Sequence, residues 1–140
     1  MPPIFTIVSN STLFSRLTFA TSLARGFYRA TTDAGLPGNK YYDLAKRYLP
    51  KGAGSVFTFG VQGGYEAGVK VAEGVAIFSL LANIGDTRSL ILHPASTTHG
   101  QLTPEQREIA GAGDDVLRLS IGLETAADLI ADLDRALERV

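Results

Sequence analysis

Four short segments of the chain have the apolar pattern of β-strands. Residues 55–61 alternate large apolar side chains with small or polar ones and are rich in β-branched and aromatic types. Shorter runs of the same kind occur at residues 78–81, 89–92 and 116–121. We predict a strand at each of these positions.

Helical spacing of apolar residues separates these strands. The pattern predicts helices over residues 40–48, 64–77 and 126–137, and the last of them is strongly amphipathic. Thr103-Pro104-Glu105 places a proline at a first helical position, which predicts a further short helix to about Ala110. Turn residues at 36–39 and 51–54 interrupt the pattern.

The order of these elements predicts an α+β fold. Strands and helices alternate, but several strands follow one another too closely for crossover helices. We therefore expect an antiparallel or mixed sheet with helices on one face. The chain has 140 residues, of which 45% are hydrophobic, so it has the size and composition of one domain with an ordinary core.

Composition excludes several classes of function. The net charge is −1 with both signs dispersed, which gives no electrostatic footprint for nucleic acid. No run of eighteen apolar residues is present, so no segment is expected to span a membrane. The chain has no cysteine, which excludes disulfides, thiolate nucleophiles and cysteine-bound metals and fits the cytoplasm.

The first 34 residues differ from the rest and receive no fold assignment. Residues 1–32 contain three arginines and ten serines or threonines but no acidic residue. This composition is typical of an organelle transit peptide, which would make the location mitochondrial. The alternative is an unrelated segment joined to a domain fragment in a truncated or misassembled reading frame. The boundary predicts a second unit over residues 35–140.

A single arginine lies within the apolar strand at 116–121. A guanidinium presents a planar fork of donors that matches a carboxylate, so Arg118 indicates a site for a carboxylate-bearing ligand. The alternative is a surface arginine paired with an aspartate or glutamate.

Other polar residues give weaker signals. His93 and His99 are six apart with no cysteine nearby, so we favour structural roles over a metal site. Glu105 and Glu108 share one helix face and are expected to be solvated, because nothing apolar surrounds them. The glycines at 60–64 lack a phosphate-loop pattern and indicate a turn.

Four ordered motifs resemble a known enzyme family. They are Ser55-Val-Phe-Thr-Phe-Gly-Val-Gln-Gly-Gly64, Leu81-Ala-Asn-Ile-Gly-Asp-Thr-Arg-Ser-Leu90, the loop from His93 to His99, and Arg118-Leu-Ser-Ile-Gly-Leu-Glu124. They resemble the C-terminal domain of O-acetylhomoserine sulfhydrylase, a pyridoxal-phosphate enzyme of cysteine and methionine metabolism with fold type I. The resemblance covers residues 35–140. It implies a transferase of methionine biosynthesis that joins O-acetylhomoserine and sulfide to give homocysteine and acetate.

The same resemblance implies roles for three residues. Arg118 would grip the α-carboxylate of the amino-acid substrate, with Asn83 and Thr98 as its partners. Asn83 stands where related lyases have the serine of a Ser-Leu-Gly-Gly segment, so this position departs from the pattern.

The cofactor is expected to come from elsewhere. Pyridoxal phosphate needs a lysine for covalent attachment, an acid beside its ring nitrogen and donors around its phosphate. The resemblance places these in a large N-terminal domain, and none of the four lysines here stands in the family's Ser-x-Thr-Lys context. They are Lys40, Lys46, Lys51 and Lys70. We therefore expect a substrate-binding domain that binds no cofactor covalently and is inactive alone.

Two alternatives remain open. The chain is one half of a split enzyme completed by a partner chain with the cofactor domain, or a non-catalytic interaction module. Without the cofactor domain, we expect apolar sheet residues to be only half covered, which favours self-association or docking. These residues are Phe57, Phe59, Leu80 and Leu92.

Overall fold

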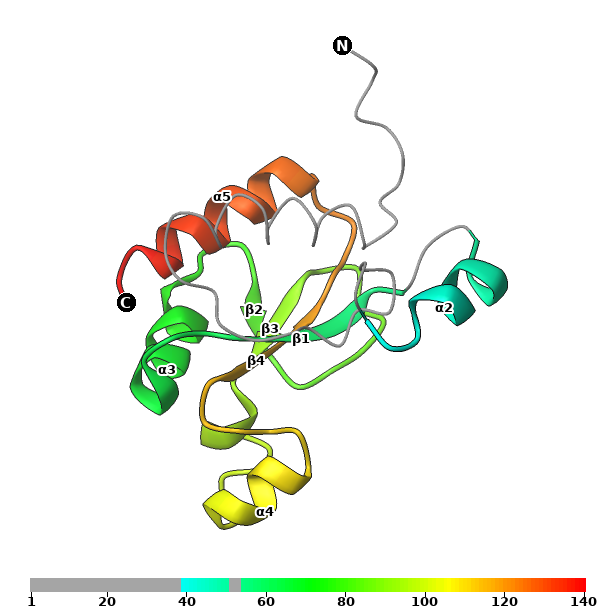
Figure 1. Cartoon of the computed structure of the whole chain (residues 1–140). Helices are drawn as coiled ribbons and strands as arrows, with labels where there is room; N and C mark the ends of the chain where they lie inside the picture. Colours follow the sequence, from blue (N-terminus) through cyan, green and yellow to red (C-terminus); the bar gives the residue numbers. More distant parts are fainter. Residues whose placement is uncertain (1–38, 51–53) are drawn as a thin grey trace.

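The computed structural model describes residues 39–50 and 54–140. The expectations for residues 1–34 and for the turn at 36–39 lie largely outside these ranges, as does most of the turn at 51–54. The elements, in chain order, are α2 (Tyr42–Tyr48), β1 (Val56–Gly60), α3 (Gly64–Gly74), β2 (Ser79–Leu80), β3 (Leu90–Leu92), the 3-10 turn η1 (Pro94–Ser96), α4 (Pro104–Ile109), β4 (Val116–Ser120) and α5 (Ala126–Leu137). Figure 1 shows their arrangement. Each predicted strand and helix is present.

The four strands form one mixed sheet in the order β1-β4-β3-β2. Strand β4 lies between β1 and β3 and is antiparallel to both, whereas β2 is parallel to β3. This arrangement confirms the prediction of a mixed sheet. It also places β4, the last strand in the sequence, at the centre, where neighbours hydrogen-bond to it on both sides.

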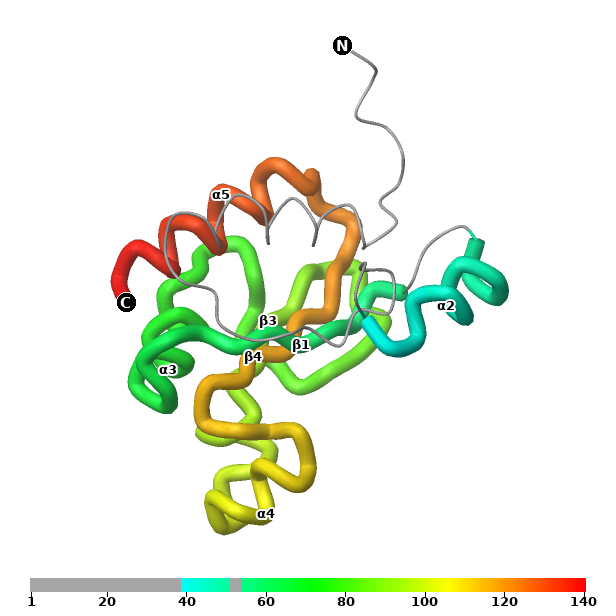
Figure 2. Tube along the Cα trace, in the orientation of Figure 1, coloured from blue at the N-terminus to red at the C-terminus, as the bar shows by residue number. Residues whose placement is uncertain are grey.

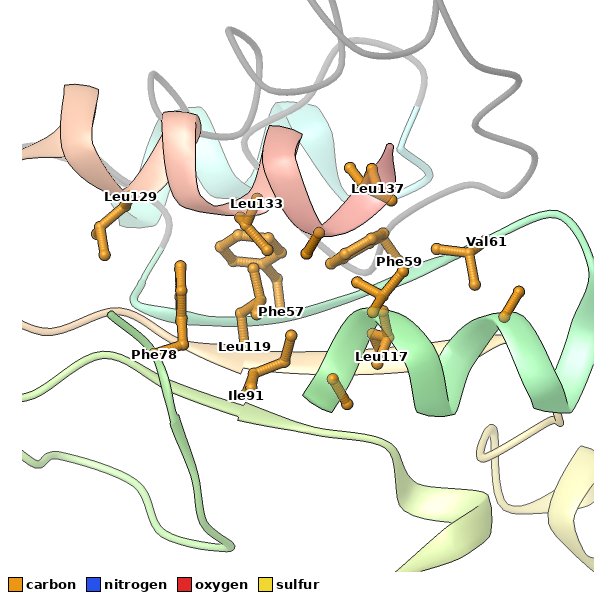
Figure 3. Packing of buried hydrophobic residues seen from close by; sticks show 14 residues of the cluster. Phe57, Phe59, Val61, Phe78, Ile91, Leu117, Leu119, Leu129, Leu133 and Leu137 are labelled. Atoms are coloured by element: carbon orange, nitrogen blue, oxygen red, sulfur yellow. The ribbon is translucent and has the colours of Figure 1, made fainter. Parts of the chain in front are cut away.

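Helices α3 and α5 cover one face of this sheet. Alternation along the strands directs Phe57 and Phe59 of β1 and Leu117 of β4 to that face, where they are almost fully buried. The helical spacing in α5 brings Leu129 and Leu133 onto them (Figure 3). The core is therefore a single layer of aliphatic and aromatic side chains between the sheet and two helices.

The expectation of half-covered sheet residues is wrong for three of the four. Phe57, Phe59 and Leu92 are 1–3% exposed, whereas Leu80 is 50% exposed. The two phenylalanines are covered because α3 and α5 come from the chain itself and complete their own core. Leu80 lies on β2, the outer strand of the sheet.

Helix α3 ends three residues before its predicted end. The extended conformation begins at Val75, and the next three main-chain N–H groups donate to the buried Asp132 of α5 instead of continuing the helix. Apolar spacing continues to Ile77, so the sequence pattern alone does not reveal this end.

Two helices lie away from the core. In the sequence, helix α4 comes between β3 and β4, and Figure 2 shows it projecting away from the strands and from α5. It buries none of its residues, and a capping box between Thr103 and Gln106 begins it. Helix α2 precedes β1 and has one buried residue, Ala45.

Candidate functional site

Arg118 lies on the sheet face opposite the core. Leu117 and Leu119 point into the core, so the alternation of β4 directs Arg118 to the other side. Its cross-strand neighbours are Thr58 of β1 and Leu92 of β3. The side chain is half-buried at the centre of the sheet. A strand position of this kind holds the base of the side chain rigidly and leaves the guanidinium accessible.

The guanidinium contacts the connection between β2 and β3. Its Nη2 donates to the main-chain carbonyl of Asn83 at 3.3 Å. Among residues 39–50 and 54–140, Arg118 forms no ion pair with an acidic side chain, while three other arginines do. These are Arg88, Arg107 and Arg135. Within that part of the chain, the alternative of an arginine paired with a carboxylate is not observed.

Asn83 presents its main chain to Arg118 and turns its side chain elsewhere. The side-chain Oδ1 accepts from the N–H of Ile84 at 2.8 Å. The carboxamide N–H group, oriented by that bond, is still available as a donor at an exposed position. The structure therefore brings Arg118 and Asn83 together through the main chain of Asn83.

Thr98 lies in the loop after β3 and is exposed. Its hydroxyl is paired with Nδ1 of the adjacent His99 at 2.8 Å. Among the residues with described positions, no hydrogen bond joins Thr98 to Arg118 or Asn83. The third candidate residue is thus placed on a neighbouring loop, and its role stays a prediction.

A pair of hydrogen bonds holds the end of the connection between β2 and β3, the segment that contains Asn83. Glu124, just after β4, accepts from the main-chain N–H and from the hydroxyl of Ser89, at 2.8 and 2.7 Å. Burial raises the pKa of the Glu124 carboxyl. These two hydrogen bonds lower the pKa by more than burial raises it, so it lies below its ordinary value. The N–H of Gly122 also donates to the Ser89 hydroxyl. The segment that carries Asn83 is thereby tied to the strand that carries Arg118.

Within this segment, Asp86 forms a local turn with Arg88. Its carboxylate accepts from the main-chain N–H and from the guanidinium of Arg88. These hydrogen bonds lower the pKa of Asp86. Because the pair is exposed, we assign it a role in the turn and no further contribution.

His93 is completely buried, which fits the structural role expected for it. Its Nδ1 is paired with the Ser96 hydroxyl and its Nε2 with the main-chain carbonyl of Asp114, each at 2.9 Å. The sequence did not point to Asp114, because the two residues are 21 positions apart. No group of three or more histidines or acidic residues suited to a metal occurs among the residues placed in the structure.

The remaining predicted surface features are placed as follows. Glu105 lies exposed in the first turn of α4, where hydrogen bonds from its own main-chain N–H and from Thr103 lower its pKa. Glu108 is exposed on the same helix. Gly63 and Gly64 have φ angles of 99° and 63°, so they form the left-handed turn between β1 and α3.

The fold places the chain among known enzyme structures. It resembles an O-acetylhomoserine (thiol)-lyase of Campylobacter jejuni with a TM-score of 0.77 and 36% identity, over 93% of this chain and 31% of that one. It also resembles yeast cystathionine gamma-lyase, with a TM-score of 0.80 and 29% identity, over 93% of this chain and 33% of that one. Both neighbours are fold-type I pyridoxal-phosphate enzymes, and the first contains N'-pyridoxyl-lysine-5'-monophosphate. The predicted fold class is confirmed.

The family is shown by the sequence itself. The model of the Cys/Met metabolism PLP-dependent enzymes matches residues 29–138, and the chain belongs to this family. It is 48% identical over 103 residues to O-acetyl-L-homoserine sulfhydrylase 1 of Thermus thermophilus, covering 74% of this chain and 24% of that protein. It is 43% identical over 106 residues to L-methionine gamma-lyase of Fusobacterium nucleatum, covering 76% and 27%. The chain thus spans about a quarter of the length of these curated relatives.

The lysines placed in the structure do not fit covalent attachment of pyridoxal phosphate. Lys40 and Lys46 are exposed near α2, with their Nζ atoms 4.7 and 5.0 Å from tyrosine ring centroids. Lys70 is exposed on α3. Attachment requires a lysine that is enclosed with an acid for the ring nitrogen and donors for the phosphate, and these three side chains are exposed on or beside helices. Lys51 lies outside the described residues.

None of the helices in the structure, within the ranges placed, has the length and apolar composition needed to cross a membrane.

Proposed function

We propose that this chain supplies the substrate-binding domain of an O-acetylhomoserine sulfhydrylase-like enzyme. Arg118 binds the α-carboxylate of the amino-acid substrate, and Asn83 and Thr98 supply further donors. The observation that supports this most is the half-buried Arg118 on a central strand, held by one main-chain carbonyl and without an acidic partner in the described ranges. A guanidinium has five N–H donors, so one such bond leaves the fork available to a carboxylate.

The strength of such a contact limits what the domain does alone. A hydrogen bond to a charged group contributes about 1.5 to 3 kcal/mol, while a millimolar dissociation constant corresponds to about 4 kcal/mol. One arginine and two polar neighbours on an exposed sheet face therefore bind a free amino acid at millimolar strength or weaker. Tighter binding requires a second domain that closes over the site and excludes water.

We propose that this second domain also supplies the cofactor lysine. Pyridoxal phosphate, when bound, supplies the electron sink of the reaction. The residues of this chain would orient the substrate through its carboxylate and leave the cofactor chemistry to the other domain. In this proposal the chain is inactive alone.

Addition of pyridoxal phosphate tests the proposal that the cofactor lysine belongs to another domain. We expect no saturable visible absorbance from a protein-bound cofactor, because the placed lysines are exposed. A saturable band that disappears on replacing one lysine, such as Lys70→Ala, would contradict the proposal.

Affinity for a carboxylate ligand tests the proposal that Arg118 binds the α-carboxylate of the substrate. L-Methionine is a suitable probe, and L-methioninamide is the matched ligand that lacks the carboxylate. We expect L-methionine to bind with a millimolar dissociation constant and the amide at least fivefold more weakly. Arg118→Gln should abolish this preference, whereas Arg47→Gln on α2 should retain it. Equal binding of both ligands, or no change with Arg118→Gln, would refute the site.

A split enzyme, completed by a partner chain that carries the cofactor domain, is the second candidate. The chain spans about a quarter of the length of its curated relatives, and in this arrangement the cofactor lysine would belong to the partner chain. Activity that appears only on mixing this chain with a separately produced cofactor domain would support that arrangement. Association without any activity would instead favour a non-catalytic interaction module.

A further inference from the structure

His93 joins three segments that are separate in the sequence. Its Nδ1 reaches Ser96 in the turn after β3, and its Nε2 reaches the main-chain carbonyl of Asp114, just before β4. The third segment is α3, where the ring of Tyr65 packs edge-on against the imidazole at 5.1 Å between centroids. A buried side chain with partners on three segments fixes their relative positions.

The fit of His93 against α3 leaves no space. A Cβ atom added at Gly68 would lie 2.5 Å from Nε2 and 2.6 Å from Cδ2 of the imidazole. Gly68 therefore allows the Nε2–Cδ2 edge of the ring to approach the helix closely. This contact explains a glycine in the middle of a helix, where glycine is otherwise unfavourable.

The hydrogen bonds also give the two ring nitrogens different partners. A carbonyl oxygen only accepts, so Nε2 carries the hydrogen that is donated to Asp114. In the neutral imidazole Nδ1 is then an acceptor for the Ser96 hydroxyl at 2.9 Å, and the same hydroxyl lies 3.3 Å from its second acceptor, the main-chain carbonyl of His93. Each partner thus requires one orientation of the ring.

These contacts connect both sides of the candidate site. The turn that His93 holds continues directly into Thr97 and Thr98, and the Thr97 hydroxyl donates to the main-chain carbonyl of His93 at 2.7 Å. On the other side, Asp114 lies four residues before Arg118, and the connection enters β4 at Val116. His93 has partners on both segments. Arg107 forms a second link close by, because it donates to the Asp114 carboxylate and to the main-chain carbonyl of Leu102.

We propose that His93 is a positioning residue for the carboxylate site. It holds the loop of Thr98 at a fixed place relative to β4, so that the Thr98 hydroxyl and the Arg118 guanidinium act on one ligand. This inference rests on the proposed function of Arg118. His93 itself is buried and does not touch the ligand.

Two variants displace the imidazole without replacing it. Gly68→Ala places a methyl group against the ring, and Ser96→Ala removes the hydroxyl partner of Nδ1. We expect each to weaken L-methionine binding by about three- to tenfold, which corresponds to the loss of about one hydrogen bond. Gly74→Ala is the matched control on the same helix, because its Cβ would contact Ala136 and Arg139 and not His93. It should alter stability while leaving the dissociation constant within twofold.

A double-mutant cycle separates positioning from a general loss of structure. In a Thr98→Val background, the effect of Gly68→Ala and Ser96→Ala on binding should disappear, because the hydroxyl that His93 positions is already absent. The dissociation constants come from NMR titrations of folded protein, so a fall in melting temperature alone does not count. Nitrogen-15 shifts of the imidazole should report a hydrogen on Nε2 in the parent chain and a changed environment in both variants.

The outcomes distinguish this proposal from the proposed function. If the parent chain shows no preference for L-methionine over its amide, the carboxylate site itself fails. If Arg118 is required but Gly68→Ala and Ser96→Ala bind as the parent does, the role of His93 is refuted. It is also refuted if Thr98→Val binds normally, or if the losses persist fully in that background.

Discussion

At the residue scale, Asp132 is the buried carboxylate that connects α5 to the segment before β2. It is 1% exposed and accepts from the main-chain N–H groups of Ala76, Ile77 and Phe78, and from Arg135. Burial raises the pKa of Asp132. The hydrogen bonds together lower the pKa by more than burial raises it, so it lies below the ordinary value of an aspartate. This carboxylate takes the place of helical hydrogen bonds beyond the end of α3.

Asp132→Asn should lower the free energy of unfolding by about 2 kcal/mol at pH 7, since it weakens hydrogen bonds to a charged group. Asp134→Asn, two residues further on the same helix, should stay within about 0.5 kcal/mol of the parent. Denaturant unfolding of the three proteins measures both changes.

The pH dependence follows from the direction of the pKa shift. The folded pKa of Asp132 is below the unfolded one, so its stabilisation is fully present above the unfolded pKa of about 3.9. It is lost as the pH falls through the folded pKa. The stability difference between parent and Asp132→Asn should therefore shrink below about pH 4. A difference that is the same at pH 3 and pH 7 would contradict this account.

At the element scale, the start of α4 depends on local hydrogen bonds. The helix buries no residue, so packing contributes little to it. The N–H of Gln106 donates to the Thr103 hydroxyl, and the Gln106 side chain accepts from the N–H of Thr103. The Thr103-Pro104 signal in the sequence predicted this start correctly because all of its determinants are within four residues.

Thr103→Ala should destabilise α4 by about 1 kcal/mol, the usual effect of removing an N-cap side chain. Thr125→Ala is the matched control, because Thr125 begins α5 without a side-chain cap. Amide hydrogen exchange within α4 should accelerate about fivefold in the first variant and stay unchanged in the second. Equal effects at both positions would show that the capping box is not what holds α4.

The connection between β2 and β3 is held by close backbone packing. A Cβ atom at Gly122 would meet the carbonyl oxygen of Thr87 and lie 2.7 Å from the Ser89 nitrogen. Backbone atoms do not yield, so the segment that carries Asn83 must move if this position gains a side chain.

Gly122→Ala should therefore cost about 1 to 3 kcal/mol of stability and weaken L-methionine binding. The control is Gly100→Ala, whose nearest contact, the Thr97 carbonyl oxygen, would lie at an ordinary 3.4 Å. Thermal unfolding measures the change in stability, and titration with L-methionine measures the change in affinity. A stable Gly122→Ala protein with parental affinity would contradict the proposed link between this packing and the site.

Most of the fold was predictable because its signals are local. Alternation identified β1 and β4, and helical spacing identified α5 to the residue. The end of α3 was not predictable, because the atoms that determine it belong to Asp132, more than fifty positions away. Distant polar contacts of this kind leave no periodic pattern.

The candidate site was predictable to a smaller degree. A lone arginine in an apolar strand pointed to Arg118, and the family resemblance pointed to Asn83 and Thr98. The contact between Arg118 and Asn83 uses a main-chain carbonyl, which every residue type has, so no choice of side chain reveals it. Ser89 and Glu124 are 35 positions apart, so the sequence pattern does not reveal their pairing either.

At the scale of the whole molecule, the hydrophobic core and Arg118 lie on opposite faces of one sheet. The core lies under α3 and α5 (Figures 1 and 3). Arg118 lies on the other face, beside the connection between β2 and β3. Helix α2 exposes large apolar side chains, with Leu44 50% and Tyr48 67% exposed. Under the proposed function, exposed apolar side chains of this kind are where the cofactor domain would dock.

The direct test of the account is the side-chain Nε–Hε NMR signal of Arg118 during titration with L-methionine. Its assignment comes from the signal that is lost in Arg118→Gln. We predict a saturable downfield shift of the Arg118 proton with L-methionine and almost none with L-methioninamide, because only the carboxylate accepts a charge-assisted hydrogen bond. The signals of Arg88 and Arg107 should stay in place. An Arg118 signal that does not move, or that moves equally with both ligands, would contradict the central claim.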